Sequence, residues 1–142
     1  MDKRGLAIIF HSGSYDRIYH GLSIAIAALA LGRNVRFFFT YWALGYLRKG
    51  PYSRAGKPGV LKFDKEAELH KEILDENIKR GHMLKLTEIF KQARQMGAKF
   101  YACTNSMGLL NIARDELSGT VDKSMGITTF LTETSSDQMI FI

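Results

Sequence analysis

One short run near the start of the chain, Leu6–Phe10, is apolar at every position and constrains the fold more than any other feature. It is bounded by Gly5 and by a polar His-Ser-Gly-Ser segment. A strand with one face in water would alternate apolar and polar residues, so a fully apolar run is typical of a strand buried on both faces of a parallel sheet. We therefore predict a strand over residues 6–10 inside an α/β fold.

The segment that follows predicts a complete strand–helix–strand unit. Ser14 or Asp16 is suited to begin a helix, whose inward face carries Ile18, Leu22, Ala25, Ile26 and Leu29 at helical spacing. Gly32 ends it in the left-handed position that glycine adopts readily. Residues 34–40 are rich in phenylalanine and predict the second strand, with a right-handed crossover between the two.

The rest of the chain continues the alternation of helix and strand. Residues 41–63 contain both prolines and predict a long loop. Helices are expected over residues 64–80, with Leu69, Ile73 and Leu74 on the inward side, and over 86–96, with Leu86, Ile89, Phe90, Ala93 and Met96 inward. Strands are expected over residues 99–102, 118–122 and 138–142, with a helix near 127–134. We predict one domain over residues 1–142 that is a three-layer α/β/α fold with a mostly parallel sheet, carrying a basic loop and an extra helix inserted at about 43–81.

Composition limits the functional classes. The chain has 142 residues, a formal net charge of +6 and one cysteine, so it forms no internal disulfide. No signal peptide or membrane span is expected, and the predicted location is cytoplasmic. Basic residues concentrate in one region, at Arg48, Lys49, Arg54, Lys57 and Lys62. This region is suited to an acidic partner or an anion, but no nucleic-acid-binding motif accompanies it.

The single cysteine, Cys103, lies in the most informative stretch, residues 97–112. It follows a short apolar run and precedes Thr104, Asn105 and Ser106, where a helix is expected to begin. Backbone N–H groups at the amino end of a helix favour a thiolate, which is the reactive form of cysteine. A lone cysteine is also commonly a small buried hydrophobe. Both interpretations stay open at this point.

Three loops are expected to meet at the carboxyl ends of the strands, where ligands collect in such folds. We predict that these loops line one pocket around Cys103, with Ser12, Gly13, Ser14, Tyr15, Tyr41, Trp42, Thr104, Asn105 and Ser106 as supporting residues. Taken singly, Ser12 and Ser14 are as well explained as turn and cap residues.

Several cysteine chemistries do not fit the sequence. A phosphatase loop needs an arginine six positions after the cysteine, where this chain has Leu109, and no second cysteine is available for dithiol exchange. The four histidines are scattered without metal-ligand spacing, so neither a metal nor another cofactor is expected. A Cys–His hydrolase stays open in principle, since His82 or His11 could approach the thiol in the fold, although no oxyanion motif is visible. Sulfur carriage as a persulfide or thiosulfonate is favoured, because it requires only an accessible thiolate.

Residues 98–107 and the following Asn111-Ile112 pair resemble the DsrE/DsrF-like sulfur-relay family, in its "peroxiredoxin-like" branch. The resemblance extends to residues 11–16, 38–44, 126–131 and 139–142, and so covers nearly the whole chain. It implies a five-stranded parallel sheet, a relay cysteine at Cys103, a partner sulfur-carrier protein, and oligomers that are often trimers, tetramers or hexamers. Whether such a relay protein acts as an enzyme, a sulfurtransferase, stays open.

Two other functions compete with sulfur relay. The Ser-Gly-Ser segment after the first strand is similar to phosphate-binding loops, which favours a flavin- or nucleotide-binding flavodoxin-like module. The protein could also be a structural oligomer subunit with an inert cysteine. An oligomer is expected independently, because one short stretch holds more apolar groups than a single strand and turn can bury inside one small subunit: Phe37, Phe38, Phe39, Tyr41, Trp42, Leu44, Tyr46 and Leu47.

Overall fold

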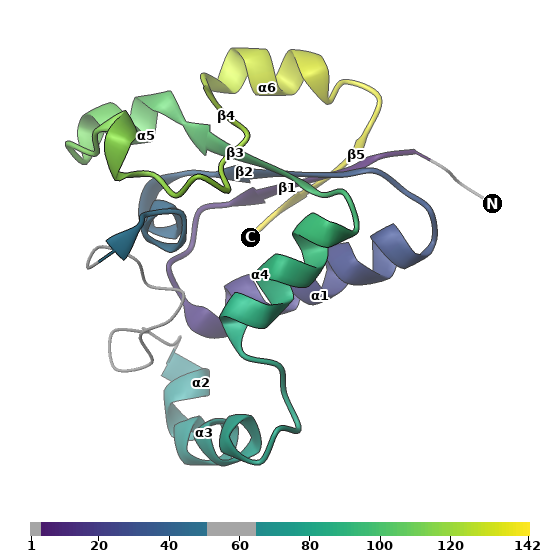
Figure 1. Ribbon diagram of the computed structural model, residues 1–142, viewed down its shortest axis with the longest axis vertical. Helices are drawn as coiled ribbons and strands as arrows, with labels where there is room; N and C mark the ends of the chain where they lie inside the picture. The colour runs from purple at the N-terminus through teal and green to yellow at the C-terminus, as the bar shows by residue number, and fades with distance from the viewer. Residues whose placement is uncertain (1–3, 51–64) are drawn as a thin grey trace.

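A five-stranded parallel sheet forms the centre of the protein (Figure 1). The structure, a computed structural model, describes residues 4–50 and 65–142. The strand order is β4-β3-β2-β1-β5, and every neighbouring pair is parallel. The strands are β1 (Leu6–Phe10), β2 (Val35–Phe39), β3 (Lys99–Cys103), β4 (Lys123–Met125) and β5 (Gln138–Phe141). The predicted α/β class and parallel sheet are therefore confirmed.

Helices cover the two faces of the sheet unequally. One face carries α1 (Tyr15–Ala30) and α4 (Leu86–Gln95), whereas the other carries the seven-residue α6 (Ile127–Glu133), as Figure 1 shows. The remaining elements are the 3₁₀ helices η1 (Tyr41–Tyr46) and η4 (Arg114–Glu116) and the short helices α2 (Lys65–Leu69), α3 (Lys71–Lys79) and α5 (Thr104–Leu109). The result is a thick layer on one side of the sheet and a thin layer on the other.

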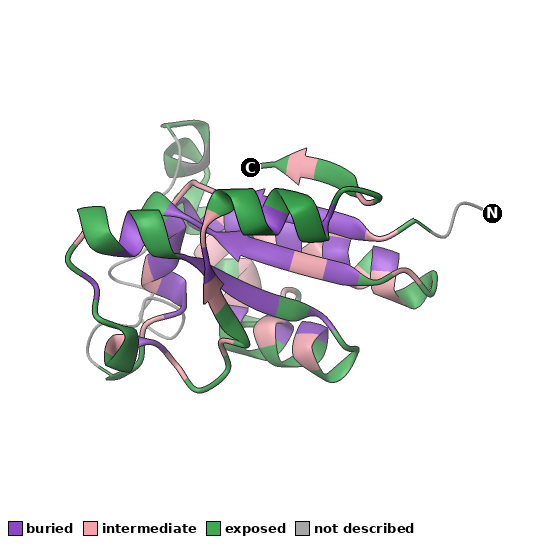
Figure 2. Ribbon diagram, turned by 90° about the horizontal axis from the view of Figure 1, so that it is seen from above, coloured by how far each residue is buried: buried purple, intermediate pink, exposed green. Residues whose placement is uncertain are grey.

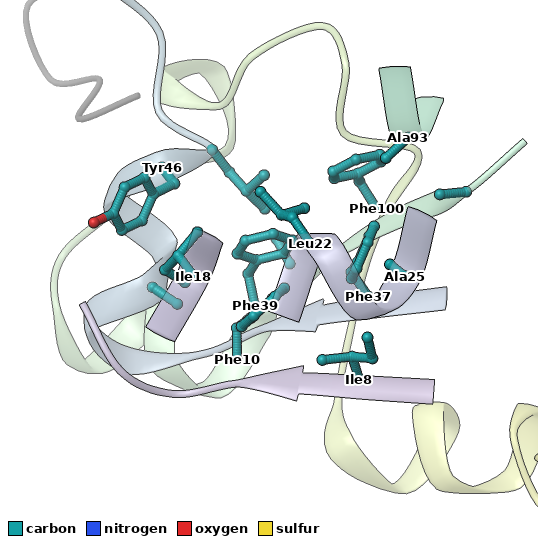
Figure 3. Close-up of a cluster of buried hydrophobic side chains, with 14 of the residues drawn as sticks. Ile8, Phe10, Ile18, Leu22, Ala25, Phe37, Phe39, Tyr46, Ala93 and Phe100 are labelled. Atoms are coloured by element: carbon teal, nitrogen blue, oxygen red, sulfur yellow. The ribbon is translucent and has the colours of Figure 1, made fainter. Parts of the chain in front are cut away.

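The larger core lies beneath α1 and α4. Alternate residues of the strands point into it and meet the inward side chains of the two helices (Figure 3): Ile8, Phe10, Ile18, Leu22, Ala25, Phe37, Phe39, Ala93 and Phe100. The rings of Phe10 and Phe37 stack at 5.6 Å between centroids, and those of Phe37 and Phe100 lie 4.9 Å apart. Burial of this aromatic surface stabilises the fold through the hydrophobic effect and ring packing.

The smaller core lies beneath α6 on the opposite face. It consists of Ala7, Ile9, Phe38, Tyr101, Cys103, Met125 and Phe130. Phe130 is the only buried residue within α6, and its ring stacks on Phe38 at 4.6 Å. Figure 2 shows that the outward side of α6 and much of β5 are exposed. This face of the sheet is therefore held by one short helix.

Two predicted elements are wrong in detail. The single helix over 64–80 is two helices separated at His70, and Leu69 and Ile73, expected inward, are 82% and 61% exposed. The side of α3 that packs against the core is the one that carries Ile78, whereas Leu74, also expected inward, is only partly buried. Met96, also expected inward, is exposed because it lies just past the end of α4.

The strand expected over 118–122 is also displaced. Ser118 accepts a hydrogen bond from the Thr120 backbone N–H at 3.2 Å, which makes this segment a turn. The strand, β4, begins at Lys123 instead. The argument for an oligomer from the aromatic stretch is wrong as well, since six of its eight residues are buried within one chain and only Tyr41 and Trp42 are exposed. The part of the predicted basic loop over 51–64 lies outside the described residues.

Candidate functional site at the carboxyl end of β3

Strand β3 carries Cys103 to the carboxyl edge of the sheet. Ala102 pairs with Phe39 of β2 and Cys103 pairs with Met125 of β4. The side chain of Cys103 belongs to the smaller core, so the thiol lies on the α6 face of the sheet. Only 4% of the residue is exposed. The thiol is therefore covered by the thin layer of the fold.

The strand-to-helix junction predicted at Cys103 is present. Cys103 is the N-cap residue of α5, with extended backbone dihedrals, and its side chain forms no capping hydrogen bond. The first backbone N–H groups of a helix have no partner within the helix. The thiol thus stands beside amide donors without being used as their acceptor.

A buried hydrogen bond fixes the start of α5 against the end of β2. The hydroxyl groups of Thr40 and Ser106 lie 2.6 Å apart, and both residues are buried. The other two polar residues after Cys103, Thr104 and Asn105, are exposed. Their side-chain oxygens, Thr104 Oγ1 and Asn105 Oδ1, lie near Gly126. The Thr40 loop and the Cys103 loop are therefore brought together, next to the start of α6.

The first predicted loop is held mainly by its own polar groups. The Ser14 backbone N–H donates to Ser12 Oγ at 3.0 Å, and the Ser14 hydroxyl bonds to Asp16. The Tyr46 hydroxyl donates to the Gly13 carbonyl at 2.9 Å, which ties this loop to η1. These contacts are those of turn residues, in keeping with the alternative interpretation of Ser12 and Ser14.

Tyr15, also a predicted supporting residue, points away from the thiol. Its side chain belongs to the larger core, on the opposite face of the sheet from Cys103. Burial, with smaller contributions from Tyr19 and Asp75, raises the pKa of Tyr15 to about 12. A second tyrosine, Tyr101, does lie in the core of the thiol, and burial raises its pKa, so it is a neutral phenol at physiological pH.

A continuous series of rings crosses the carboxyl edge of the sheet beside this site. The ring of Phe141 lies 5.9 Å from His11, His11 lies 4.8 Å from Tyr41, and Tyr41 lies 5.9 Å from Trp42. We call these four residues the aromatic row. Phe141 is 68% exposed and Trp42 is 52% exposed. The row runs from β5 across β1 to η1, which follows the strand next to Cys103.

The sequence did not identify the residues that surround the thiol. Met125 and Phe130 come from segments far from Cys103 in the chain, and only the pairing of β3 with β4 and the docking of α6 bring them near. Phe141 was expected in a strand, but its exposure could not be foreseen without knowing that β5 is an edge strand. Alternation within the last strand, Met139 and Phe141 against Ile140 and Ile142, was the signal available.

Within residues 4–50 and 65–142, no group of three or more His, Cys, Asp or Glu side chains is arranged to hold a metal ion. The helices in the same ranges are all too short or too polar to cross a membrane.

Known proteins are similar to this chain in sequence. The model of a family described as "DsrE/DsrF/DrsH-like" matches residues 2–141. The "Uncharacterized protein YrkE" of Bacillus subtilis is 27% identical over 143 residues, covering 89% of this chain and 88% of that protein. The "Sulfur carrier protein DsrE2" of Allochromatium vinosum is 40% identical over 63 residues, which are 42% of this chain and 40% of that protein.

Two solved structures share the fold. The ychN protein of Escherichia coli superposes with a TM-score of 0.66 at 13% identity, covering 98% of this chain and 99% of that one. The protein of unknown function MTH1491 from Methanobacterium thermoautotrophicum superposes with a TM-score of 0.59 at 14% identity, covering 99% and 100%. At these identities the likeness establishes the fold alone.

Proposed function

The chain belongs to the DsrE/DsrF/DrsH-like family, and from that premise we propose that it is a sulfur carrier that holds sulfur on Cys103. The observation that carries the proposal is the position of the single cysteine at the carboxyl end of β3 and the amino end of α5. Similarity over part of the chain to a protein named as a sulfur carrier supports it. The protein would act in the cytoplasm, where thiols stay reduced.

The proposed reaction is a transfer between sulfur atoms. The Cys103 thiolate attacks the outer sulfur of a donor persulfide, R–S–S–H, and forms a new S–S bond. The donor's S–S bond breaks, R–S⁻ leaves with the electron pair, and the proton stays on the terminal sulfur of Cys103–S–S–H. An acceptor thiolate then attacks that terminal sulfur in the same way and regenerates the Cys103 thiolate. No external oxidant or reductant is needed in either step.

Access to the thiol depends on α6. Cys103 is almost fully covered, and α6 contributes only Phe130 to the core that covers it. At the carboxyl end of α6, Arg36 Nη1 donates a hydrogen bond to the Glu133 carbonyl at 2.6 Å. Because few contacts hold the helix, we propose that it moves outward when a donor or acceptor docks.

Copies of the chain are proposed to associate through the aromatic row. Three of the four rings are exposed, His11 is half-buried, and the four are contiguous, which is typical of a surface that contacts another protein. Closed assemblies of identical subunits are the common outcome of such a surface. Light scattering on the wild type and on a Trp42→Glu variant tests this. A species of one 16.0 kDa chain at all concentrations would contradict it.

The decisive test of the carrier function is intact mass spectrometry after incubation with inorganic polysulfide. The native protein should gain about 32 Da per sulfur atom held, and Cys103→Ala should gain nothing while keeping its circular dichroism spectrum. A matched control is the same chain unfolded in urea, in which the thiol is exposed without the strand-to-helix junction. Loading of the native protein should be slower than loading of the unfolded chain, because α6 covers the thiol, and Phe130→Ala should load faster than the wild type.

Addition of a small thiol should then remove the adduct, since the chain has no second cysteine to resolve it. If the native protein resists every sulfane donor while the unfolded chain loads with them, the inert structural subunit takes the place of the carrier.

A further inference from the structure

A second concave site lies on the opposite face of the sheet from the thiol. It is a cavity of about 500 Å³ lined by the end of η1 and the residues after it, by α4, by Phe100 of β3 and by the turn near 118–120. Its aromatic wall belongs to the larger core, whereas Cys103 belongs to the smaller one. Figure 1 shows α4 on the far side of the sheet from α6. The cavity is therefore independent of the proposed sulfur site.

The charged side chains that line this cavity are all positive. Its lining includes Arg48, Lys49, Lys91 and Arg94 and contains no acidic residue. Arg48 is paired with Glu116 at 2.8 Å. The side chains of Lys49, Lys91 and Arg94 form no ion pair with a carboxylate in the described parts of the chain. Three cationic groups thus converge on one cavity without a compensating charge, which favours an anionic ligand.

Arg94 gives the most specific indication. Its guanidinium carbon lies 4.7 Å from the centroid of the Phe100 ring, so the group is held in place by a cation–π contact. Its Nη2 atom is buried and has no hydrogen-bond partner among the residues that the structure describes. A buried donor without an acceptor costs free energy. Arg94 also lines the cavity, and a guanidinium binds groups that carry several acceptor oxygens in a bidentate manner.

The rest of the lining is aromatic and hydroxylic. Tyr46, Phe90 and Phe100 form one side, with the rings of Phe90 and Phe100 5.8 Å apart, and Thr87, Ser118 and Thr120 supply hydroxyl groups. A cavity of this volume is within the range of about 300 to 1,000 Å³ that small-molecule sites occupy. It is larger than a bare oxyanion requires, so the ligand has a body as well as an anionic head.

We propose that this cavity binds a phosphate monoester with an aromatic body, of the size of a nucleoside monophosphate. The phosphate contacts Arg94, Lys91 and Lys49, and the flat body lies along Phe90. Hydroxyl groups of the body bond to the Ser118 and Thr120 side. The site is distinct from the Ser-Gly-Ser loop after β1, and its occupation does not require Cys103.

Isothermal titration calorimetry with four probes tests the proposal: AMP, phenyl phosphate, adenosine and inorganic phosphate. AMP should bind more tightly than either adenosine or inorganic phosphate, because each of those lacks one half of the ligand. Phenyl phosphate distinguishes an aryl phosphate from a nucleotide: equal affinity for both assigns the site to aryl phosphates in general, and tighter binding of AMP assigns it to nucleotides. Inorganic phosphate binding as tightly as AMP, or absence of binding by every probe, overturns the proposal.

Two lysine variants provide the matched comparison. Lys91→Glu changes the charge in the cavity and offers Arg94 a carboxylate within the protein, so it should weaken AMP binding by roughly tenfold or more. Lys99→Glu makes the same charge change at an exposed lysine outside the cavity and should alter affinity by less than about twofold. Equal losses in the two variants would mean that binding follows net charge alone, which refutes a built site.

Arg94→Lys keeps the charge and removes the planar fork, and should also weaken AMP binding if its melting temperature shows that it is folded. Cys103→Ala should bind AMP as the wild type does. Loss of AMP binding in Cys103→Ala would contradict the separation of the two sites, whereas failure of sulfur loading with AMP binding intact would count against the sulfur carrier alone.

Discussion

Gly21 of α1 offers a sharp test of how the thick layer is packed. The residue is buried, and α1 crosses β1 so closely that a Cβ atom built on Gly21 would overlap Cε1 of Phe10. The same Cβ would lie 2.5 Å from Cζ of Phe10 and 2.9 Å from Cδ1 of Ile142. Ordinary contact between carbon atoms is about 3.5 to 4.0 Å. Gly21→Ala therefore requires the Phe10 ring to move.

The Phe10 ring has little room to do so. It is fully buried, and it packs against Phe37 and Phe39 at centroid distances of 5.6 Å and 5.1 Å. Overpacking of this kind costs about 1 to 3 kcal/mol, and the overlap here is large enough to place the cost near 3. Alanine recovers up to about 1 kcal/mol of helix propensity relative to glycine. The net expectation is a loss of about 2 kcal/mol in the free energy of unfolding.

Gly108 of α5 provides the matched control, because a Cβ atom there would have no neighbour within 4 Å. Gly108→Ala should stabilise the protein by about 0.5 to 1 kcal/mol, so the same substitution has opposite signs in two helices. Urea denaturation followed by circular dichroism measures both. If Gly21→Ala is neutral or stabilising, the close approach of α1 to β1 is wrong.

Three further predictions concern the site and the pH dependence of stability. Phe130→Ala should lower the free energy of unfolding by about 3 kcal/mol and speed the alkylation of Cys103, because Phe130 is the buried residue that holds α6. An unchanged alkylation rate would show that α6 does not control access to the thiol. Ser106→Ala should cost about 1 to 3 kcal/mol by leaving the Thr40 hydroxyl unpaired, and adding Thr40→Val should cost less than the sum of the two changes in urea denaturation. Because the pKa of Tyr15 rises from 10.0 to about 12 on folding, the unfolded chain releases a proton between these values that the native protein keeps. The contribution of Tyr15 to the free energy of unfolding is therefore fully present below pH 10 and is lost as the pH rises toward 12. In a urea–pH series, Tyr15→Phe should make this fall smaller by about 1 to 2 kcal/mol.

The sequence predicted the sheet well because the local patterns agreed with the tertiary structure. The fully apolar Leu6–Phe10 run became the interior strand β1, which lies between β2 and β5 and is buried at all five positions. Gly32 and Gly97, expected as helix stops, adopt φ angles of +79° and +98° just past α1 and α4. The conformation of these glycines depends on the local backbone and not on distant neighbours, so it can be predicted from the sequence.

Features that depend on which elements become neighbours could not be predicted in the same way. The aromatic residues from Phe37 to Leu47 look excessive for one subunit, yet six of the eight are buried, five in the larger core and Phe38 in the smaller core beneath α6. The amphipathic pattern at Leu69 and Ile73 favours burial, but no element covers that side of α2 and α3 among the described residues. A pattern shows which face a residue occupies but not whether a partner covers that face.

The unequal layers connect stability with the proposed function. A parallel sheet with both faces equally covered would bury its thiol under as much apolar surface as its main core. Here α1 and α4 pack the larger core, with fully buried phenylalanines contributed by three strands, whereas the smaller core is closed by α6 through Phe130. Opening the thin layer therefore exposes few apolar groups and leaves the larger core intact, so it costs much less than global unfolding. The thiol of Cys103 lies on the side where the fold can open at low cost, which is where a carrier that must both accept and release sulfur requires it.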